Sequence, residues 1–131
     1  MRVVAQGSGD RRWVRVARVE DVPVDGGIAV RYGDEQLAVF HFATRNAWYA
    51  TQNLCPHKRE MVLARGILGD QAGVPKVACP LHKKTFDLTN GSCLSGDDLS
   101  IATFAVRIED DDVFVELPPI EELRHAGGCK S

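Results

Sequence analysis

Short apolar or alternating runs, separated by turn residues, dominate the chain on both sides of its middle. An apolar side chain at every second position is typical of a strand with one buried face. No window keeps a helical period over three turns, and no segment repeats. The pattern predicts strands at 13–19, 28–32, 36–42, 48–50, 105–108 and 113–117.

Turn residues divide these runs and predict where the chain reverses. Breaks are expected at 25–27, 33–35 and 45–46, and Glu109 to Asp112 is expected to form an acidic hairpin turn. Pro118-Pro119 ends the last run. The pattern predicts an all-β fold, a small antiparallel β-sandwich or barrel with a long excursion between about residues 53 and 93. We expect one domain over 1–117 and a short C-terminal tail over 118–131.

Composition supports a single ordinary globular domain. The chain has 131 residues, of which 44% are hydrophobic and 26% charged. Its net charge of −2, from 16 basic and 18 acidic residues, predicts neither nucleic-acid nor membrane-surface binding. No apolar run is long enough to span a bilayer, and the first residues lack the apolar stretch of a secretory signal. We therefore expect a cytoplasmic protein.

Two matched boxes of cysteine and histidine lie within the excursion: Cys55-Pro56-His57 and Cys79-Pro80-Leu81-His82. Each offers one thiolate and one imidazole, and a [2Fe-2S] cluster needs two ligands for each iron. When two histidines bind one iron, the reduction potential rises, because neutral imidazoles replace charged thiolates. The proline after each cysteine fixes φ and stiffens the ligand loop. The boxes predict a Rieske-type cluster on Cys55, His57, Cys79 and His82.

Zinc binding, a disulfide and chance clustering compete with a cluster as the origin of the two boxes. Zinc accepts two cysteines and two histidines, but the Cys-x-His spacing is tight for a zinc pair. A disulfide between Cys55 and Cys79 is disfavoured in a reducing compartment. Chance is disfavoured because both boxes carry the same residue types in the same order, each with its proline. The cluster is therefore the favoured prediction.

The boxes, together with Thr85 to Leu94, resemble a Rieske ferredoxin-type domain from about Trp13 to Leu117. The chain is further similar to the small-subunit family of assimilatory NAD(P)H-dependent nitrite reductases in segments 55–60, 64–70, 75–77 and 79–83. Within these segments, residues 65–70 and Lys83 are the features most specific to that family. This resemblance implies an electron-transfer subunit without a substrate site of its own. It also implies a large partner subunit, carrying flavin, an iron–sulfur cluster and sirohaem, that reduces nitrite to ammonium.

Departures from related families keep two alternatives open. A Rieske ferredoxin serving an oxygenase would share the cluster, although such proteins usually have glycine where this chain has Lys83. Some small subunits lack the four ligands and are structural, whereas this chain keeps all of them. Membrane-bound Rieske proteins resemble it less, having cysteines at the positions of Glu60 and Leu81. They also have hydroxyl groups at those of Lys84 and Phe86, and hydrogen bonds to cluster sulfurs raise the potential, so we expect a potential low in the Rieske range.

Further side chains carry lesser expectations. Lys58, Arg59, Lys83 and Lys84 follow the histidines, and we expect them to form a docking surface for an acidic partner. Cys93 is expected to be a small buried residue and Cys129 a tail thiol, neither of them a ligand. We expect His41 to be packed or half-exposed, and Trp13 and Trp48 to serve packing.

Overall fold

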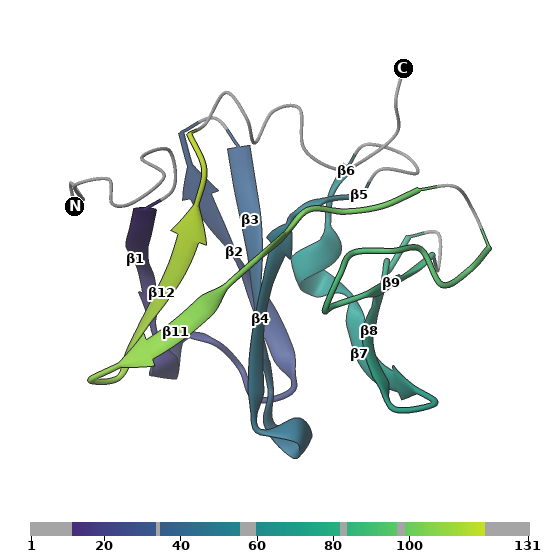
Figure 1. Ribbon diagram of the computed structural model, residues 1–131, viewed down its shortest axis with the longest axis horizontal. Helices are drawn as coiled ribbons and strands as arrows, with labels where there is room; N and C mark the ends of the chain where they lie inside the picture. The colour runs from purple at the N-terminus through teal and green to yellow at the C-terminus, as the bar shows by residue number, and fades with distance from the viewer. Residues whose placement is uncertain (1–11, 34, 56–59, 82–83, 97–98, 120–131) are drawn as a thin grey trace.

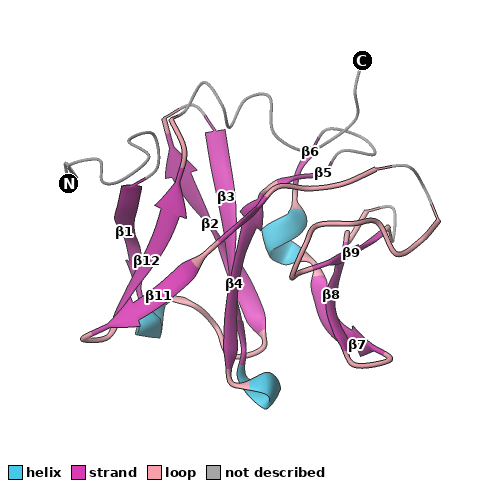
Figure 2. Ribbon diagram, viewed as in Figure 1, coloured by secondary structure: helices cyan, strands magenta, loops and turns pink. Residues whose placement is uncertain are grey.

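The structure is a computed structural model that describes residues 12–33, 35–55, 60–81, 84–96 and 99–119 (Figure 1). Short strands connected by loops and 3-10 turns make up this part of the chain (Figure 2). The strands are β1 (Arg12–Arg18), β2 (Gly26–Tyr32), β3 (Glu35–Phe42), β4 (Ala47–Gln52), β5 (Leu54–Cys55), β6 (Glu60–Met61), β7 (Ile67–Gln71), β8 (Val74–Ala78), β9 (Thr85–Asp87), β10 (Thr103–Phe104), β11 (Val106–Glu109) and β12 (Asp112–Leu117). The 3-10 helices are η1 (Val19–Asp21), η2 (Ala43–Arg45) and η3 (Leu63–Arg65).

Two sheets form a β-sandwich, built from the strands that precede and follow the excursion in the chain. One has the strand order β1-β12-β11 and the other β10-β4-β3-β2, and the named strands pair antiparallel. A first core fills the sandwich, with Val22, Leu37, Val39, Ala50, Phe104, Val113, Val115 and Leu117 buried in it. The prediction of an all-β antiparallel fold is confirmed.

Strand β3 is buried on both faces and joins the sandwich to the rest of the domain. Leu37 and Val39 point into the first core, whereas Ala38, Phe40 and Phe42 belong to a second core. Successive side chains of a strand point to opposite faces, so a strand covered on both sides is apolar at nearly every position. This double burial explains the run Leu-Ala-Val-Phe at 37–40.

The excursion between the fourth and the fifth predicted strands has strands of its own. Two small sheets, β5-β6 and β7-β8-β9, lie beside the sandwich (Figure 1). They cover the second core, whose buried members beyond β3 are Cys55, Leu63, Ala64, Val77, Cys79, Phe86, Leu88 and Ile101. The sequence pattern does not predict these strands. Strands β5, β6 and β9 have only two or three residues, and β7 and β8 contain glycine and proline, which are typical of turns.

Among the predicted boundaries that differ from the structure, two have clear local reasons. The break at 25–27 reduces to Asp25, whose φ is +57°, and β2 already begins at Gly26. Gly27 is needed inside the strand, because a Cβ there would lie 2.6 Å from Cδ1 of Phe40 on the neighbouring strand. The first strand ends at Arg18, one residue early, because Val19 begins η1.

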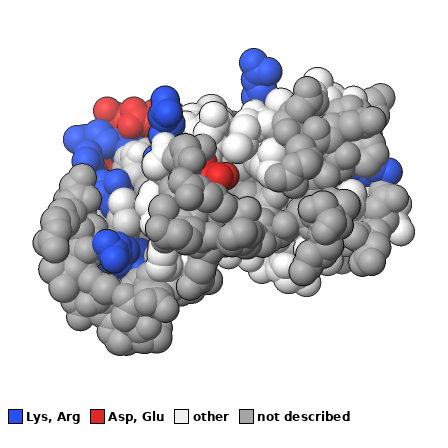
Figure 3. Space-filling view, turned by 90° about the horizontal axis from the view of Figure 1, so that it is seen from above, with Lys and Arg blue, Asp and Glu red and all other residues white. Residues whose placement is uncertain are grey.

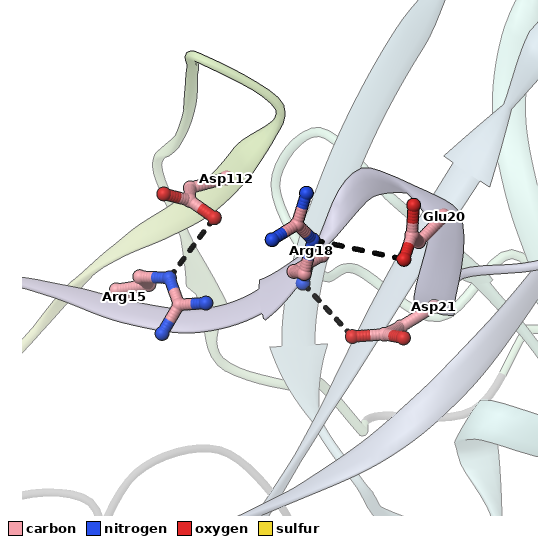
Figure 4. A network of polar contacts seen from close by, with 5 residues as sticks. All are labelled: Arg15, Arg18, Glu20, Asp21 and Asp112. Carbon is pink, nitrogen blue, oxygen red and sulfur yellow. Dashed lines mark hydrogen bonds and ion pairs between the residues drawn. The ribbon is translucent and has the colours of Figure 1, made fainter.

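Polar contacts mark that end of β1 (Figure 4). The backbone N–H of Arg18 donates to Asp21 Oδ2 at 3.0 Å, which caps η1. Arg15 Nε lies 3.0 Å from Asp112 Oδ1 on β12, and Arg18 Nε lies 3.7 Å from Glu20 Oε2. The start of η1 is joined to the β11–β12 hairpin by the backbone N–H of Val19, which donates to Asp111 O at 2.9 Å.

The predicted acidic turn and the predicted last strand both occur. Glu109 pairs with Asp112, and Asp110 and Asp111 between them have φ of +51° and +66°, as a two-residue type I′ turn requires. Strand β12 ends at Leu117, before the prolines, and residues 120–131 of the expected tail lie outside the described residues. Within the described part of the chain, no helix is long and apolar enough to cross a membrane.

Candidate metal centre

The first box begins at a buried cysteine on a short strand. Cys55 ends β5 and pairs with Glu60 at the start of β6. The side chain of Cys55 is fully buried in the second core. Residues 56–59, which include His57, lie outside the described residues.

The second box has the same local arrangement. Cys79 follows β8, and its backbone N–H donates to the carbonyl oxygen of Lys84 at 2.7 Å. Its side chain is 1% exposed, whereas Leu81 two residues later is 52% exposed. His82 and Lys83 lie outside the described residues. Each cysteine is therefore held by backbone pairing to a residue just beyond its box.

Folding brings the two cysteines into one cluster of buried side chains. Cys55 and Cys79 both belong to the second core, together with Leu63, Val77 and Phe86. No disulfide joins the described cysteines, so both sulfurs can serve as ligands. Both predicted cysteine ligands are buried. The predicted histidine ligands fall outside the described residues.

The chemistry of these two residues fits an iron–sulfur cluster. A thiolate buried among apolar side chains is costly unless its charge is neutralised, and a metal neutralises it. Soft thiolate ligands suit iron–sulfur clusters, and burial keeps water from the sulfur atoms. The apolar neighbours Leu63 and Phe86 supply that burial here, since both are fully buried.

A buried polar segment precedes the first box, and the sequence pattern does not predict it. Thr51, Gln52 and Asn53 are 0%, 4% and 1% exposed. Polar side chains are rarely buried without hydrogen-bond partners. The one sequence signal for this segment is a run of three polar residues between a predicted strand and a ligand box. Such a run would ordinarily indicate an exposed connecting loop, so it does not by itself predict burial.

The remaining candidate residues have packing roles. The backbone of Cys93 forms an isolated antiparallel β-bridge with that of Phe86. Cys93 is half-buried against the second core, and it is therefore more exposed than predicted. His41 is half-buried, as predicted, and stacks on Trp48 with ring centroids 4.1 Å apart. The guanidinium group of Arg107 lies 4.5 Å from the ring centroid of Trp13.

The surface near Cys79 is partly apolar. A groove of about 360 Å³ runs beside Cys79 and is lined by residues of β7 and β8 and by Pro80. Ile67, at its edge, is 72% exposed. Of the four basic residues expected to dock a partner, only Lys84 lies within the described residues, and it is half-buried. The described Lys and Arg residues visible in Figure 3 do not gather into one patch.

Comparison with known proteins relates this fold and these boxes to one family. The family model described as a Rieske-like [2Fe-2S] domain matches residues 12–116. The NAD(P)H nitrite reductase of Emericella nidulans is 41% identical over 106 residues, which cover 77% of this chain. The chain spans only 9% of the length of that protein.

Separate small subunits match over nearly their full length. The NADH nitrite reductase small subunit of Escherichia coli is 29% identical over 99 residues, covering 76% of this chain and 92% of that protein. A crystal structure described as the NADH-dependent nitrite reductase small subunit of Mycobacterium tuberculosis superposes with a TM-score of 0.75 at 27% identity, covering 82% of this chain and 96% of that one. The chain is thus homologous to the small subunits of NAD(P)H nitrite reductases.

A ferredoxin shares the fold less closely. The Sphingomonas yanoikuyae B1 ferredoxin superposes with a TM-score of 0.64 at 30% identity, covering 80% of this chain and 98% of that one. The family match covers both sheets of the sandwich and both boxes, and it identifies a Rieske-type [2Fe-2S] cluster as the cofactor. The chain belongs to the family of Rieske-like [2Fe-2S] domains.

Proposed function

We propose that this chain is the small subunit of a cytoplasmic NAD(P)H-dependent nitrite reductase of nitrate assimilation. In this proposal Cys55, His57, Cys79 and His82 bind the Rieske cluster, and residues 1–117 form the cluster domain. The partner is the large subunit with flavin and sirohaem, which reduces nitrite to ammonium. The observation that carries the proposal is the burial of Cys55 and Cys79 in one core, in a chain homologous to nitrite reductase small subunits.

The residues of the chain have distinct roles in such a centre. A bound Rieske cluster supplies reversible one-electron transfer at a potential above that of all-cysteine clusters. Cys55 and Cys79 would hold its inner iron, and Leu63 and Phe86 exclude water from their sulfur atoms. In the sequence the histidines follow their cysteines by two and three positions. Leu81, the residue before His82, is exposed. This arrangement favours outer ligands that face a partner.

Substitution of single ligands tests the binding site. His57→Ala and His82→Ala should each abolish the asymmetric electron paramagnetic resonance signal of the reduced protein, because each removes one of four ligands. Cys93→Ser and Cys129→Ser are the matched controls and should leave the signal intact. Loss of the cluster in Cys93→Ser, with retention in His82→Ala, would show that the ligand assignment is wrong.

A ferredoxin serving an oxygenase is the second candidate, favoured by the match to the Sphingomonas yanoikuyae B1 ferredoxin. The two functions differ in the partner. Co-purification with an untagged large subunit from cells grown on nitrate supports the nitrite reductase assignment. Electron transfer to an oxygenase, without association with the large subunit, would support the ferredoxin assignment.

The basic residues beside the histidines predict how the subunits meet. If Lys58, Arg59, Lys83 and Lys84 steer docking, the association rate should fall steeply with salt, since charges are screened beyond about 8 Å at physiological ionic strength. Reversing Lys83 and Lys84 to Glu should mainly slow association. Association rates measured against ionic strength for both proteins test this. A flat dependence with unchanged rates would favour the exposed apolar residues Ile67 and Leu81 as the docking surface instead.

A further inference from the structure

We propose that Gln52 and Asn53 are positioning residues that hold Cys55 in place for the cluster. The proposal rests on Cys55 being a ligand, as proposed above. Both residues are buried; Gln52 ends β4 of the sandwich, and Asn53 connects it to β5, which carries Cys55. Together they tie that segment to three other parts of the chain.

Gln52 holds the peptide group that leads into Cys55. Its Nε2 donates to the carbonyl oxygen of Leu54 at 2.7 Å. That oxygen belongs to the peptide bond whose nitrogen is the backbone nitrogen of Cys55, and a planar peptide moves as one unit. Fixing Leu54 O therefore also fixes the direction in which the backbone enters Cys55.

The other end of the Gln52 side chain is anchored just before β10. Ala102 N–H donates to Gln52 Oε1 at 2.7 Å, and Gln52 N–H donates to Ala102 O at 3.0 Å. Ala102 follows Ile101, which is buried in the second core with Cys55. Gln52 thus links the first box to the segment that returns from the excursion.

Asn53 ties the same segment to β3 and to η3. Its Oδ1 accepts from Ala64 N–H at 2.7 Å, and its Nδ2 donates to Gln36 Oε1 at 2.8 Å. Its backbone adds two bonds, donating to Gln36 O at 3.0 Å and accepting from Leu63 N–H at 3.0 Å. All four hydrogen-bonding groups of a fully buried residue are thereby satisfied.

The chemistry of the partners determines which way both amides face. The N–H groups of Ala64 and Ala102 can only donate, so each must meet an amide oxygen. The carbonyl oxygen of Leu54 can only accept, so it must meet the amide nitrogen of Gln52. Gln52→Glu keeps the oxygen that accepts from Ala102 N–H but loses the nitrogen that donates to Leu54 O, so it removes that one bond.

Backbone contacts support the second box among the described residues. The backbone N–H of Cys79 donates to the carbonyl oxygen of Lys84, and the pairing of β8 with β9 holds the strand that leads into Cys79. Strand β5 has only two residues, so backbone pairing alone holds Cys55 weakly. The side-chain network compensates for the shortness of this strand.

The test measures how firmly the loaded protein keeps its iron. The full chain is purified with its cluster, and loss of visible absorbance is followed in a ferrous-iron chelator. Gln52→Glu and Asn53→Ala should each release iron about 10- to 100-fold faster, the usual effect of removing a group that orients a metal ligand. The paramagnetic resonance spectrum of the reduced protein should shift, because the Cys55 sulfur would no longer be held in one orientation.

A matched control separates positioning from general stability. Tyr32→Phe removes the hydrogen bond from the hydroxyl to Pro118 O at 2.6 Å, in the sandwich. It should lower the unfolding free energy and leave the iron-release rate and the spectrum unchanged. Asn53→Asp keeps the oxygen that accepts from Ala64 N–H, and Gln36 can turn its amide to donate to the new carboxylate. The iron-release rate of Asn53→Asp should therefore lie closer to that of the normal chain than to that of Asn53→Ala.

If Asn53→Ala does not fold, Gln36→Met removes the acceptor of Asn53 Nδ2 from β3 and should accelerate release in the same direction. The proposal would be overturned if the Gln52 and Asn53 variants behaved as the Tyr32→Phe control does, with lower stability but normal iron-release rates and spectra. A normal chain without a Rieske signal would refute the proposed function as well. A normal signal with unaffected variants would refute the positioning role alone.

Discussion

A single added methyl group at Gly91 should destabilise the domain severely. Gly91 has a φ of +83°, and a Cβ there would lie 1.9 Å from the carbonyl oxygen of Ile101. Carbon atoms do not approach an oxygen so closely, and the obstacle is backbone. Gly91→Ala therefore requires the 91–101 pairing to open, in which Ile101 N–H donates to Gly91 O at 2.8 Å.

The magnitude follows from two contributions. A left-handed conformation costs a non-glycine residue about 1–2 kcal/mol. Loss of the hydrogen bond at Ile101, which is 3% exposed, leaves buried backbone groups unsatisfied at about 1–3 kcal/mol. Together these predict a fall in unfolding free energy of roughly 2–5 kcal/mol, or roughly 8–20 °C in melting temperature for a domain of this size.

Two other glycines separate these contributions. Gly73 and Gly96 have φ of +87° and +93°, and no atom lies within 4 Å of a Cβ built on either. Gly73→Ala and Gly96→Ala should therefore show only the conformational cost, about 1–2 kcal/mol. Urea unfolding followed by circular dichroism measures all three variants. If Gly91→Ala were no more destabilising than these controls, the close approach to Ile101 would not be a determinant of the fold.

Further predictions concern the two hairpin tips. Asp111→Gly should raise the unfolding free energy by about 0.5–1 kcal/mol, because glycine adopts the positive φ of +66° without strain; an unchanged or lower midpoint in urea would contradict this. Asp70→Ala should lower the unfolding free energy by about 1 kcal/mol, because Asp70 accepts a hydrogen bond from Gly73 N–H at 2.8 Å and forms an ion pair with Arg45 on η2. Part of the Asp70→Ala effect should disappear in 1 M salt, and an effect independent of salt would show that the ion pair contributes nothing.

Local chemistry explains which features can be predicted from the sequence. The turn at Asp110 and Asp111 lies between two alternating strands, and the prolines after Leu117 cannot continue a ladder. Cys55 and Cys79 are recognisable because each stands beside a proline and near a histidine. All these signals lie within a few neighbouring residues, where sequence alone determines backbone preference and donor type.

Contacts between distant residues produce the features that the sequence does not predict. The double burial of β3 depends on a second core formed by the excursion, and a run such as 37–40 alone cannot show which faces are covered. The sequence predicts Gly27 as part of a turn, but the reason for a glycine there is the ring of Phe40 on another strand.

The sequence by itself determined the antiparallel β class and predicted the donor set, because strand period and ligand chemistry are properties of short segments. Tertiary structure alone decided that Cys55 and Cys79 share one apolar core. It also decided that Gln52 and Asn53, which resemble loop residues, are buried with hydrogen-bond partners supplied by Gln36, Ala64 and Ala102. The physical reason is that burial and hydrogen-bond satisfaction depend on which distant segments the folded chain brings together.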